Sequence, residues 1–539
     1  MFKPNTSHRQ TNIFGFANLI TPKMAKELQE SEEQKFYELI FCNIKEEDFA
    51  CLYSEIDSRP NIPINCVVSA MLIQNRNRLT YEKLFDNIKF NLLTKTALGL
   101  STLDEAPFSE ASLFNFQNKL ASYFIQTGEN LLEKVFDHLT KKQLKELKIK
   151  TDIQRTDSFQ AASNIRRYSR LQLLVEMLIR IHRVITEEDR KEYEELFSPY
   201  VNKTSGQFLY RLSSEDIPKE FEVVGKVYKE INDKLKPKYP DVEIFKIFER
   251  VYSEHFTKIL VPSGEEKIII RSTNELTSSM IQSPDDIDAT YRKKSGKEFY
   301  GQTVNIVETC NPENQLNLIT DISVHTNNID DSKELNERID AVKEKTPGLN
   351  ELHFDGAYSS KDNDVKFEEH SITPVQTAIR GREPGGVEIK IEQVSGEKYL
   401  VSCPNQTVES EITKKRFKAE FDLSICSNCP FASGNPSLRE KCQLIRKKNV
   451  NVYYFTEEEY LKKQRFESIE KIPKERRSLR TNIEATVSEF TRKMNNKKLK
   501  VRGSFKAEIF AFSVGIGVNF GRICRYLSSP IPQSALSNT

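Results

Sequence analysis

The sequence predicts a mixed α/β fold, in which an all-helical N-terminal region precedes a mixed sheet with a helical insertion. Three observations favour this class. Apolar residues recur at helical spacing over residues 1–145, and again from 171 to about 260. Between these ranges, "LKIKTDIQRTD" (147–157) alternates with the period of two that is typical of a strand. Two β-rich runs, "GQTVNIVET" and "QLNLITDISVHT", come after the second helical range and predict a hairpin.

The predicted strands follow a definite order along the chain. The first ends at "RTDS" with Asp157, and a helical insertion at about 160–265 comes next. The hairpin is followed by a polar helix at about 331–345 and by the short strand "ELHF", which ends at Asp355-Gly356. A last strand is predicted near "SITPVQTA". The core order is therefore strand, helical insertion, two strands, helix, strand and strand.

The composition excludes several classes of protein. A chain of 539 residues is too long for one compact core, so several domains are expected. The start "MFKPNTSHRQTNIFGF" lacks the charged-then-apolar pattern of a signal peptide. The apolar stretch at 509–520 is too short to span a bilayer and predicts a buried helix. Nine mostly scattered cysteines argue against a secreted disulfide framework, so we expect a soluble intracellular protein.

The distribution of charge indicates a polyanion partner, although the net charge is only +2. Residues 471–506 hold twelve Lys or Arg and three Glu. One of these acids, Glu484, lies at the edge of the apolar stripe of a predicted amphipathic helix. It either forms an i,i+4 pair with Arg480, worth only ~0.2–0.5 kcal/mol, or is a metal ligand in a site for polyanions. The stripe itself consists of Leu479, Ile483, Val487, Phe490 and Met494.

Two further acids stand at the ends of predicted core strands. Taken alone, Asp157 fits the N-cap of a following helix, and Asp355-Gly356 fits an ordinary turn. Taken with Glu484, they indicate carboxylates that gather around a divalent cation. Mg²⁺ prefers carboxylate and water oxygens, and two such ions stabilise the attacking and leaving oxygens in phosphoryl transfer. Asp321, within a strand, and Asp364, in a predicted polar loop, rank below Asp355.

The polar, turn-rich stretch 381–470 carries four of the nine cysteines. Thiolates at the spacing of its one CxxC knuckle can close a tetrahedral zinc site. A second CxxC is absent, so four reduced cysteines in a loop region remain the alternative. The clustering favours zinc, because the segment has little apolar content around which to fold. The predicted ligands are Cys403, Cys426, Cys429 and Cys442.

Several stretches resemble the DDE transposases of bacterial insertion sequences, whose catalytic core has the ribonuclease H-like fold. Those stretches include "RTDSFQAASNIRRYSRLQLLVEML", "SPDDIDATYRKKSGKEFYGQTVNIVET", "FDGAYSS" and "RRSLRTNIEATVSEFTRK". The pieces "RPNIPINCVVSAMLIQ" and "PFSEASLFNFQNKL" are similar to the helical N-terminal domain of these enzymes. The resemblance covers nearly the whole chain.

The resemblance places Asp157, Asp355 and Glu484 at the catalytic DDE positions, as ligands of Mg²⁺ or Mn²⁺. Arg480 matches the Arg of the signature Y-x2-R-x3-E-x6-K, but Arg477 replaces its Tyr and Thr491 replaces its Lys. The cations expected to hold DNA are Arg477, Arg480, Arg492, Lys493, Lys497, Lys498 and Lys500.

The implied function is metal-dependent cleavage at the terminal inverted repeats of a transposon, followed by strand transfer into target DNA. The alternatives are a metal-dependent nuclease on the same fold and a catalytically inactive DNA-binding protein. The resemblance further implies a prokaryotic, cytoplasmic protein that associates with the nucleoid and with no membrane. On transposon ends we expect a homodimer or a higher oligomer.

The predicted domains follow from these observations. Residues 1–145 form the helical N-terminal DNA-binding domain, and 146–380 form the ribonuclease H-like core with its helical insertion. Residues 381–470 form the Cys-containing insertion. Residues 471–539 form C-terminal helices that complete the catalytic core.

Overall fold

The computed structural model of the protein has a mixed α/β fold with a helical N-terminal region. The chain divides into two compact units. The first unit comprises residues 1–150, 158–329 and 484–539, and the second comprises 151–157 and 330–483. The predicted start of the Cys-containing insertion, residue 381, lies outside the described residues. The structure describes the chain except residues 11–12, 14, 55–59, 105, 261–265, 295, 378–388, 434–441 and 530–539.

The N-terminal region is helical, as predicted. Most of its helices begin at a Ser, Thr or Asn whose side chain accepts a hydrogen bond from a backbone N–H of the first turn, as Ser31 and Ser109 do. The helices are α1 (Pro22–Gln29), α2 (Glu32–Leu39), α3 (Ile64–Asn77), α4 (Tyr81–Phe90), α5 (Leu92–Ala97), α6 (Glu110–Thr127) and α7 (Leu131–Glu146).

The sheet of the first unit contains the predicted hairpin. Strands β5 (Lys297–Thr309) and β6 (Ile319–Thr326) pair antiparallel, and β4 (Thr290–Lys294) pairs antiparallel with β5. The last residues of β1 (Ile153–Ala162) also belong to this unit and lie beside β5. There the Gln160 amide donates a hydrogen bond to Thr303 Oγ1 at 2.9 Å.

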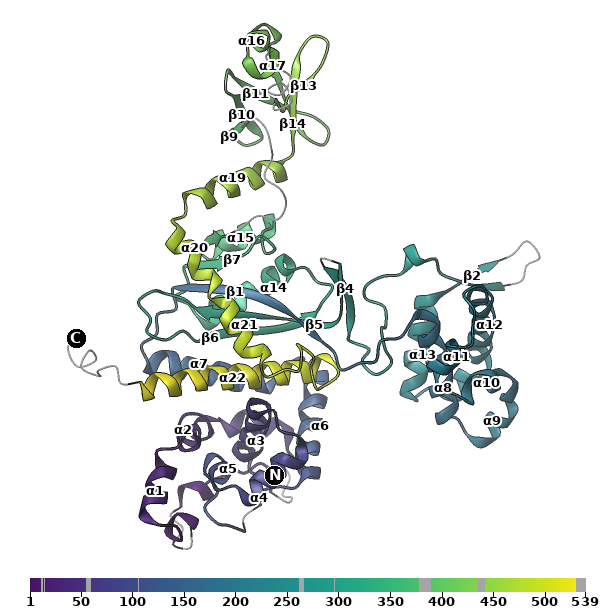
Figure 1. The fold of residues 1–539 in the computed structure, drawn as a ribbon, viewed down its shortest axis with the longest axis vertical. Helices are drawn as coiled ribbons and strands as arrows, with labels where there is room; N and C mark the ends of the chain where they lie inside the picture. The colour runs from purple at the N-terminus through teal and green to yellow at the C-terminus, as the bar shows by residue number, and fades with distance from the viewer. Residues whose placement is uncertain are drawn as a thin grey trace, which may run out of the picture. The chain divides into compact units, whose positions relative to one another are not determined.

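The C-terminal helix α22 (Ser504–Ser528) is the centre of the first unit's core (Figure 1). It is long and apolar enough to cross a membrane, but 78% of its most apolar window is buried inside the protein. This confirms the predicted buried helix. A Cβ at Gly515 would lie 2.2 Å from Ile322 Cδ1, so only glycine allows α22 to pack this closely on β6. The same core includes residues of α2, α3, α7, β5 and β6.

The helical insertion gathers into one bundle with its own hydrophobic core (Figure 1). The predicted helical pattern from 171 to about 260 is thus confirmed, and a short hairpin of β2 (Phe256–Leu260) and β3 (Glu266–Ile270) ends it. The helices are α8 (Arg170–Val184), α9 (Glu187–Glu192), α10 (Glu194–Val201), α11 (Ser205–Leu209), α12 (Ile217–Glu230) and α13 (Glu243–His255).

The second unit contains a parallel sheet. The first residues of β1 pair with β7 (Glu351–Phe354), which pairs with β8 (Thr373–Gln376). These strands and α14 (Asp331–Lys345) lie where the sequence predicts them. The predicted polar loop around Asp364 is wrong, because residues Lys361–Glu369 form helix α15, which is capped by Ser360.

The Cys-containing segment also belongs to the second unit. Its strands form a sheet in the order β13-β14-β12-β11-β10-β9. Tyr399, Val401, Phe417 and Phe455 lie in a hydrophobic core of its own, so the expectation of little apolar content is wrong. The elements are β9 (Lys390–Ser395), β10 (Lys398–Cys403), β11 (Gln406–Ile412), β12 (Phe417–Phe421), α16 (Leu423–Ser427), α17 (Pro430–Ser433), β13 (Ile445–Arg446), β14 (Asn451–Phe455) and α19 (Glu457–Lys471).

The basic amphipathic helix predicted around Glu484 is two helices. Helix α20 (Lys474–Thr481) ends the second unit, and α21 (Ile483–Thr491) follows in the first unit after a turn at Asn482. A continuous helix would need the Leu479 carbonyl oxygen as the acceptor for the Ile483 N–H. In the structure, Arg155 Nη1 donates to that oxygen at 2.5 Å.

Candidate active site

Asp157 and Asp355 lie on neighbouring parallel strands of the second unit. Ile153 pairs with Glu351, and Arg155 pairs with His353. Asp157 and Asp355 each lie two residues beyond this last pair. Side chains two residues apart point to the same face, and neighbouring strands lie about 4.8 Å apart. The two carboxylates therefore share one face of the sheet.

The sequence places Asp157 at a strand end, and this detail is wrong. Strand β1 continues to Ala162, so Asp157 lies in its middle. The alternative of an N-cap is also wrong, because the next helix begins only at Arg170, with Ser169 as its cap. Asp355 does follow the last residue of β7, and its Oδ1 accepts a hydrogen bond from Ala357 N at 2.8 Å.

Arg480 connects the two aspartates. Its Nη2 lies 3.2 Å from Asp157 Oδ2 and 3.5 Å from Asp355 Oδ2. The exposed fractions of the three side chains are 15% for Arg480, 18% for Asp157 and 34% for Asp355. Arg480 is therefore no i,i+4 partner of Glu484 in this structure, because its charge is used by acids far away in the sequence. Two carboxylates converge here on one positive charge.

Helix α20 is fixed to the strands that carry these acids. Arg476 forms an ion pair with Glu351, at the start of β7. Arg155, on β1, donates a hydrogen bond to the Leu479 carbonyl oxygen near the other end of the helix. Sequence reasoning missed Arg476, because in a run of cations nothing local shows which one has a buried partner.

Glu484 is the second residue of α21 and belongs to the first unit. It is exposed in the first turn of α21, while Ile483 and Phe490 of the same helix are buried. Within the described part of the first unit, its carboxylate has no hydrogen bond or ion pair. Asp157 and Asp355 belong to the second unit, and the boundary between the units falls between Ile483 and Glu484.

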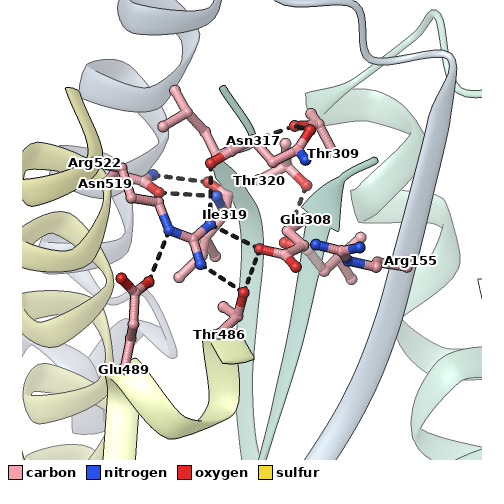
Figure 2. Close-up of polar contacts among 12 residues, drawn as sticks. Arg155, Glu308, Thr309, Asn317, Ile319, Thr320, Thr486, Glu489, Asn519 and Arg522 are labelled. Carbon is pink, nitrogen blue, oxygen red and sulfur yellow. Dashed lines mark hydrogen bonds and ion pairs between the residues drawn. The ribbon is translucent and has the colours of Figure 1, made fainter. Parts of the chain in front are cut away.

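A buried polar network anchors α21 within the first unit (Figure 2). Glu308, on β5, is fully buried and accepts hydrogen bonds from Thr486 Oγ1 at 2.7 Å and from Arg522 Nη1 at 2.8 Å. Arg522 also bonds Glu489 at 2.8 Å and the Asn317 carbonyl oxygen at 3.0 Å. Thr486 and Glu489 lie two and five residues after Glu484 on α21, so this network sets the position of the helix that carries Glu484.

The predicted DNA-binding cations occupy both units. Arg477 and Arg480 lie on α20 in the second unit. The others lie in the first unit, where Leu499 N and Lys497 O form backbone hydrogen bonds with Ala162 of β1 at 2.8 and 2.9 Å. This pairing holds the basic segment beside the end of the strand that contains Asp157. Exposed side chains in the segment are those of Arg492, Lys497, Lys498 and Lys500, and Lys493 is partly buried.

The two lower-ranked acids, Asp321 and Asp364, lie on other elements of the fold. Asp321 lies in β6 and is fully buried, and Asp364 forms an ion pair with Arg465. Neither lies on β1 or β7.

The carboxylate oxygens of Asp157 and Asp355 in the second unit are chemically suited to bind a divalent cation. Asp157 and Asp355 offer the carboxylate oxygens that Mg²⁺ and Mn²⁺ prefer, and Arg480 stands in as the cation between them. Among the residues that the structure describes, no three His, Cys, Asp or Glu side chains gather closely enough to hold an ion. Because Mg²⁺ usually keeps several waters and is bound through one or two carboxylates, two aspartates match its usual protein ligands.

The four predicted zinc ligands line one small cavity of the second unit. Cys403 ends β10, and Cys426 and Cys429 are joined by a hydrogen bond between their backbones at 3.1 Å. Cys426 is also a member of the segment's hydrophobic core. The four cysteines do cluster, but within the described residues their side chains are not close enough together to hold a metal ion.

Zinc binding therefore stays a prediction, with apolar packing of thiols as its alternative. If zinc is bound, the purified reduced protein retains about one equivalent per chain. Cys429→Ser should then release the metal, while Cys51→Ser, at an exposed site elsewhere, should not. Metal analysis by mass spectrometry checks this, and a wild-type protein free of zinc would leave only the packing role.

Comparison with known proteins gives one match. Residues 396–524 match a family model described as "Transposase DDE domain". The matched residues include Glu484, the four clustered cysteines and all the predicted DNA-binding cations, whereas Asp157 and Asp355 precede them. No curated protein and no solved structure matches the chain.

The match confirms part of the resemblance seen in the sequence: the chain contains a transposase DDE domain in residues 396–524. Such a domain implies a ribonuclease H-like fold, and the structure has a mixed sheet and a helical N-terminal region, so the predicted fold class is confirmed. Origin in a bacterial insertion sequence stays a prediction. DDE transposases act on DNA by phosphoryl transfer and generally use divalent metals.

Proposed function

We propose that this protein is a DNA transposase that cuts DNA at the ends of a transposon and joins them to target DNA. One observation carries the proposal. Asp157 and Asp355, 198 positions apart in the chain, converge on one cationic group in a protein whose later residues match a transposase DDE domain.

The residues proposed to hold the metal are Asp157, Asp355 and Glu484. When bound, divalent ions supply a more acidic water and neutralise the charge that develops on the phosphoryl oxygens. The aspartates are held by the register of β1 and β7. Glu484 lies in the first turn of α21, where its side chain is exposed.

The exposed cations of residues 492–500 are proposed to hold DNA phosphates. They follow α21, which carries Glu484 in its first turn. Phosphate contacts of this kind position DNA without reading its sequence.

Arg480 gives a test of the metal site that needs no substrate. Arg480→Gln leaves two partly buried carboxylates without their cation, which should lower stability by about 1–3 kcal/mol. Because the guanidinium and the metal compete for the same oxygens, Mn²⁺ should raise the unfolding midpoint of Arg480→Gln more than that of the wild type. Thermal unfolding with and without Mn²⁺ measures this, and Arg477→Gln on the same helix is the control. Equal effects of Mn²⁺ on all three proteins would contradict a shared site.

The function itself is tested with the DNA that flanks the gene. A linear fragment that carries both flanks is incubated with the protein and Mg²⁺, and the ends of the products are mapped at nucleotide resolution. We expect breaks at the outer ends of two inverted repeats, and no breaks without the metal. Breaks scattered along the fragment would instead indicate a nuclease.

A further inference from the structure

The first unit contains a second concave site, away from the acids. A cavity of about 610 Å³ is bounded by α3 and the turn that follows it, by α6, and by the chain from Lys493 to Phe510. Its volume lies within the ~300–1,000 Å³ typical of pockets that enclose small ligands. A DNA duplex is far too wide to enter it.

The cavity is strongly cationic. Of the residues that line it, five are Lys or Arg, and no Asp or Glu is found among those that the structure describes. Arg502 is paired, at 3.3 Å from Asp285. Burial, together with the nearby Arg76 and Arg78, lowers the pKa of Lys493. Positive charge is therefore crowded here with little compensation. The lining cations are Arg78, Lys493, Lys500, Arg502 and Lys506.

Aromatic rings and amides complete the lining. Tyr81 and Phe114 have ring centroids 4.7 Å apart, and Phe114 is 38% exposed, so its ring has a free face. An exposed aromatic face beside cations is the arrangement on which proteins stack unpaired bases. Amide side chains can in addition bond to the edge of a base. The amides of the lining are Gln74, Asn75, Gln117, Asn118 and Asn164.

The cavity lies at a defined place relative to Glu484. Helix α21 has nine residues, which span about 14 Å at 1.5 Å per residue. Glu484 stands in its first turn, and Lys493 lies two residues after its last residue, Thr491. A strand that runs along α21 would cover this distance with a few nucleotides.

We infer that this cavity binds one or two unpaired nucleotides of a DNA strand that continues along α21 toward Glu484. This inference rests on the proposed function, because it takes DNA as the substrate. It adds a second binding site for that DNA. Phe114 stacks on the base, while Lys493 and Lys506 contact the phosphates. The cavity thus distinguishes a strand with unpaired nucleotides from an intact duplex.

The test measures DNA binding by fluorescence anisotropy, with the full chain in EDTA so that catalysis plays no part. The probes are a labelled twelve-nucleotide oligothymidylate and a labelled 30-base-pair duplex. Phe114→Ala should weaken binding of the single strand about tenfold, with little effect on the duplex. Lys506→Gln, at an exposed position, should reduce the salt slope for the single strand by about 0.7.

Two matched controls lie outside the cavity. Phe90→Ala removes another exposed phenylalanine of the N-terminal region, and Lys141→Gln removes another exposed lysine. Neither should change binding of the single strand. If the Phe114→Ala protein bound the oligothymidylate as tightly as the wild type does, the proposed role of the cavity would be overturned. An equal loss of affinity for the single strand and for the duplex would overturn it too. Either result would leave the transposase proposal intact. Wild-type protein that binds neither probe would overturn both.

Discussion

Asp157→Asn and Asp355→Asn are each expected to reduce DNA cleavage by at least about 10³-fold. Metal-bound chemistry contributes several kcal/mol to the stabilisation of the transition state, and about 4 kcal/mol corresponds to this factor. Asn keeps the size of Asp but removes the charge that holds the cation. Binding of DNA should change little, because carboxylates do not attract phosphates. Cleavage of the flanking DNA and anisotropy with the same fragment measure the two effects.

Asp364→Asn is the matched control for these variants. Asp364 is an acid of the same unit, but its partner is Arg465 and it lies on α15. Its replacement should leave cleavage within about twofold, since it belongs to no metal site. If Asp364→Asn abolished cleavage while Asp355→Asn did not, the second catalytic acid would be misassigned.

Arg522→Met is expected to destabilise the protein by about 3–5 kcal/mol, because it removes the guanidinium that neutralises the buried charge of Glu308. Glu308 is fully buried and only 12% of the Arg522 side chain is exposed, so water cannot replace the lost contacts. The midpoint of denaturant unfolding measures the loss. Cleavage should fall as well, because Thr486 and Glu489 lose the partner that holds the helix of Glu484.

Arg525→Met serves as the control for Arg522. Arg525 bonds the same Glu489 at 2.8 Å, but it is 66% exposed, so its loss should cost about 1 kcal/mol or less. Glu308→Gln combined with Arg522→Met should recover part of the stability, because the unpaired charge is gone. If Arg522→Met and Arg525→Met behaved alike, the network would not be what anchors α21.

Much of the fold is visible in the sequence because local patterns determine it. The alternation in "GQTVNIVET" and "QLNLITDISVHT" gives β5 and β6, and "ELHF" gives β7. Strand bounds depend on pairing with distant segments, which local patterns do not show. The pattern of 147–157 placed the first strand too early, because Leu147 caps α7 and the pairing continues to Ala162.

The acids of the site can be predicted from the sequence, but the contacts that their side chains make cannot. Asp157 and Asp355 could be chosen from their places near strands, but their alignment depends on the register of β1 and β7. Arg480 has a local partner four residues away in the sequence, and nothing there shows that two distant aspartates replace it. A signal for Arg522 did exist. In "VNFGRICRYL", an Arg inside an apolar helix requires a buried acceptor, which is Glu308.

The cavity beneath α3 and α6 could not be predicted from local patterns, since its lining comes from segments about 400 residues apart. Arg78 shows why. It ends α3 in a left-handed conformation, with φ of 57°, and only the folded chain brings it toward Lys493 and Lys500. Four of the five lining cations belong to the basic run of 471–506, and Arg78 comes from the N-terminal region.

Joining of DNA ends tests the central claim most directly. A short duplex that carries one terminal repeat with a free 3′-hydroxyl is incubated with a supercoiled plasmid, the protein and Mg²⁺, and the plasmid junctions are sequenced. The account predicts covalent insertion of the 3′ end into the plasmid by the wild type and none by Asp157→Asn, Asp355→Asn or Glu484→Gln. Plasmid nicking without any joined end, or joining that persists in the Asp355→Asn protein, would contradict it.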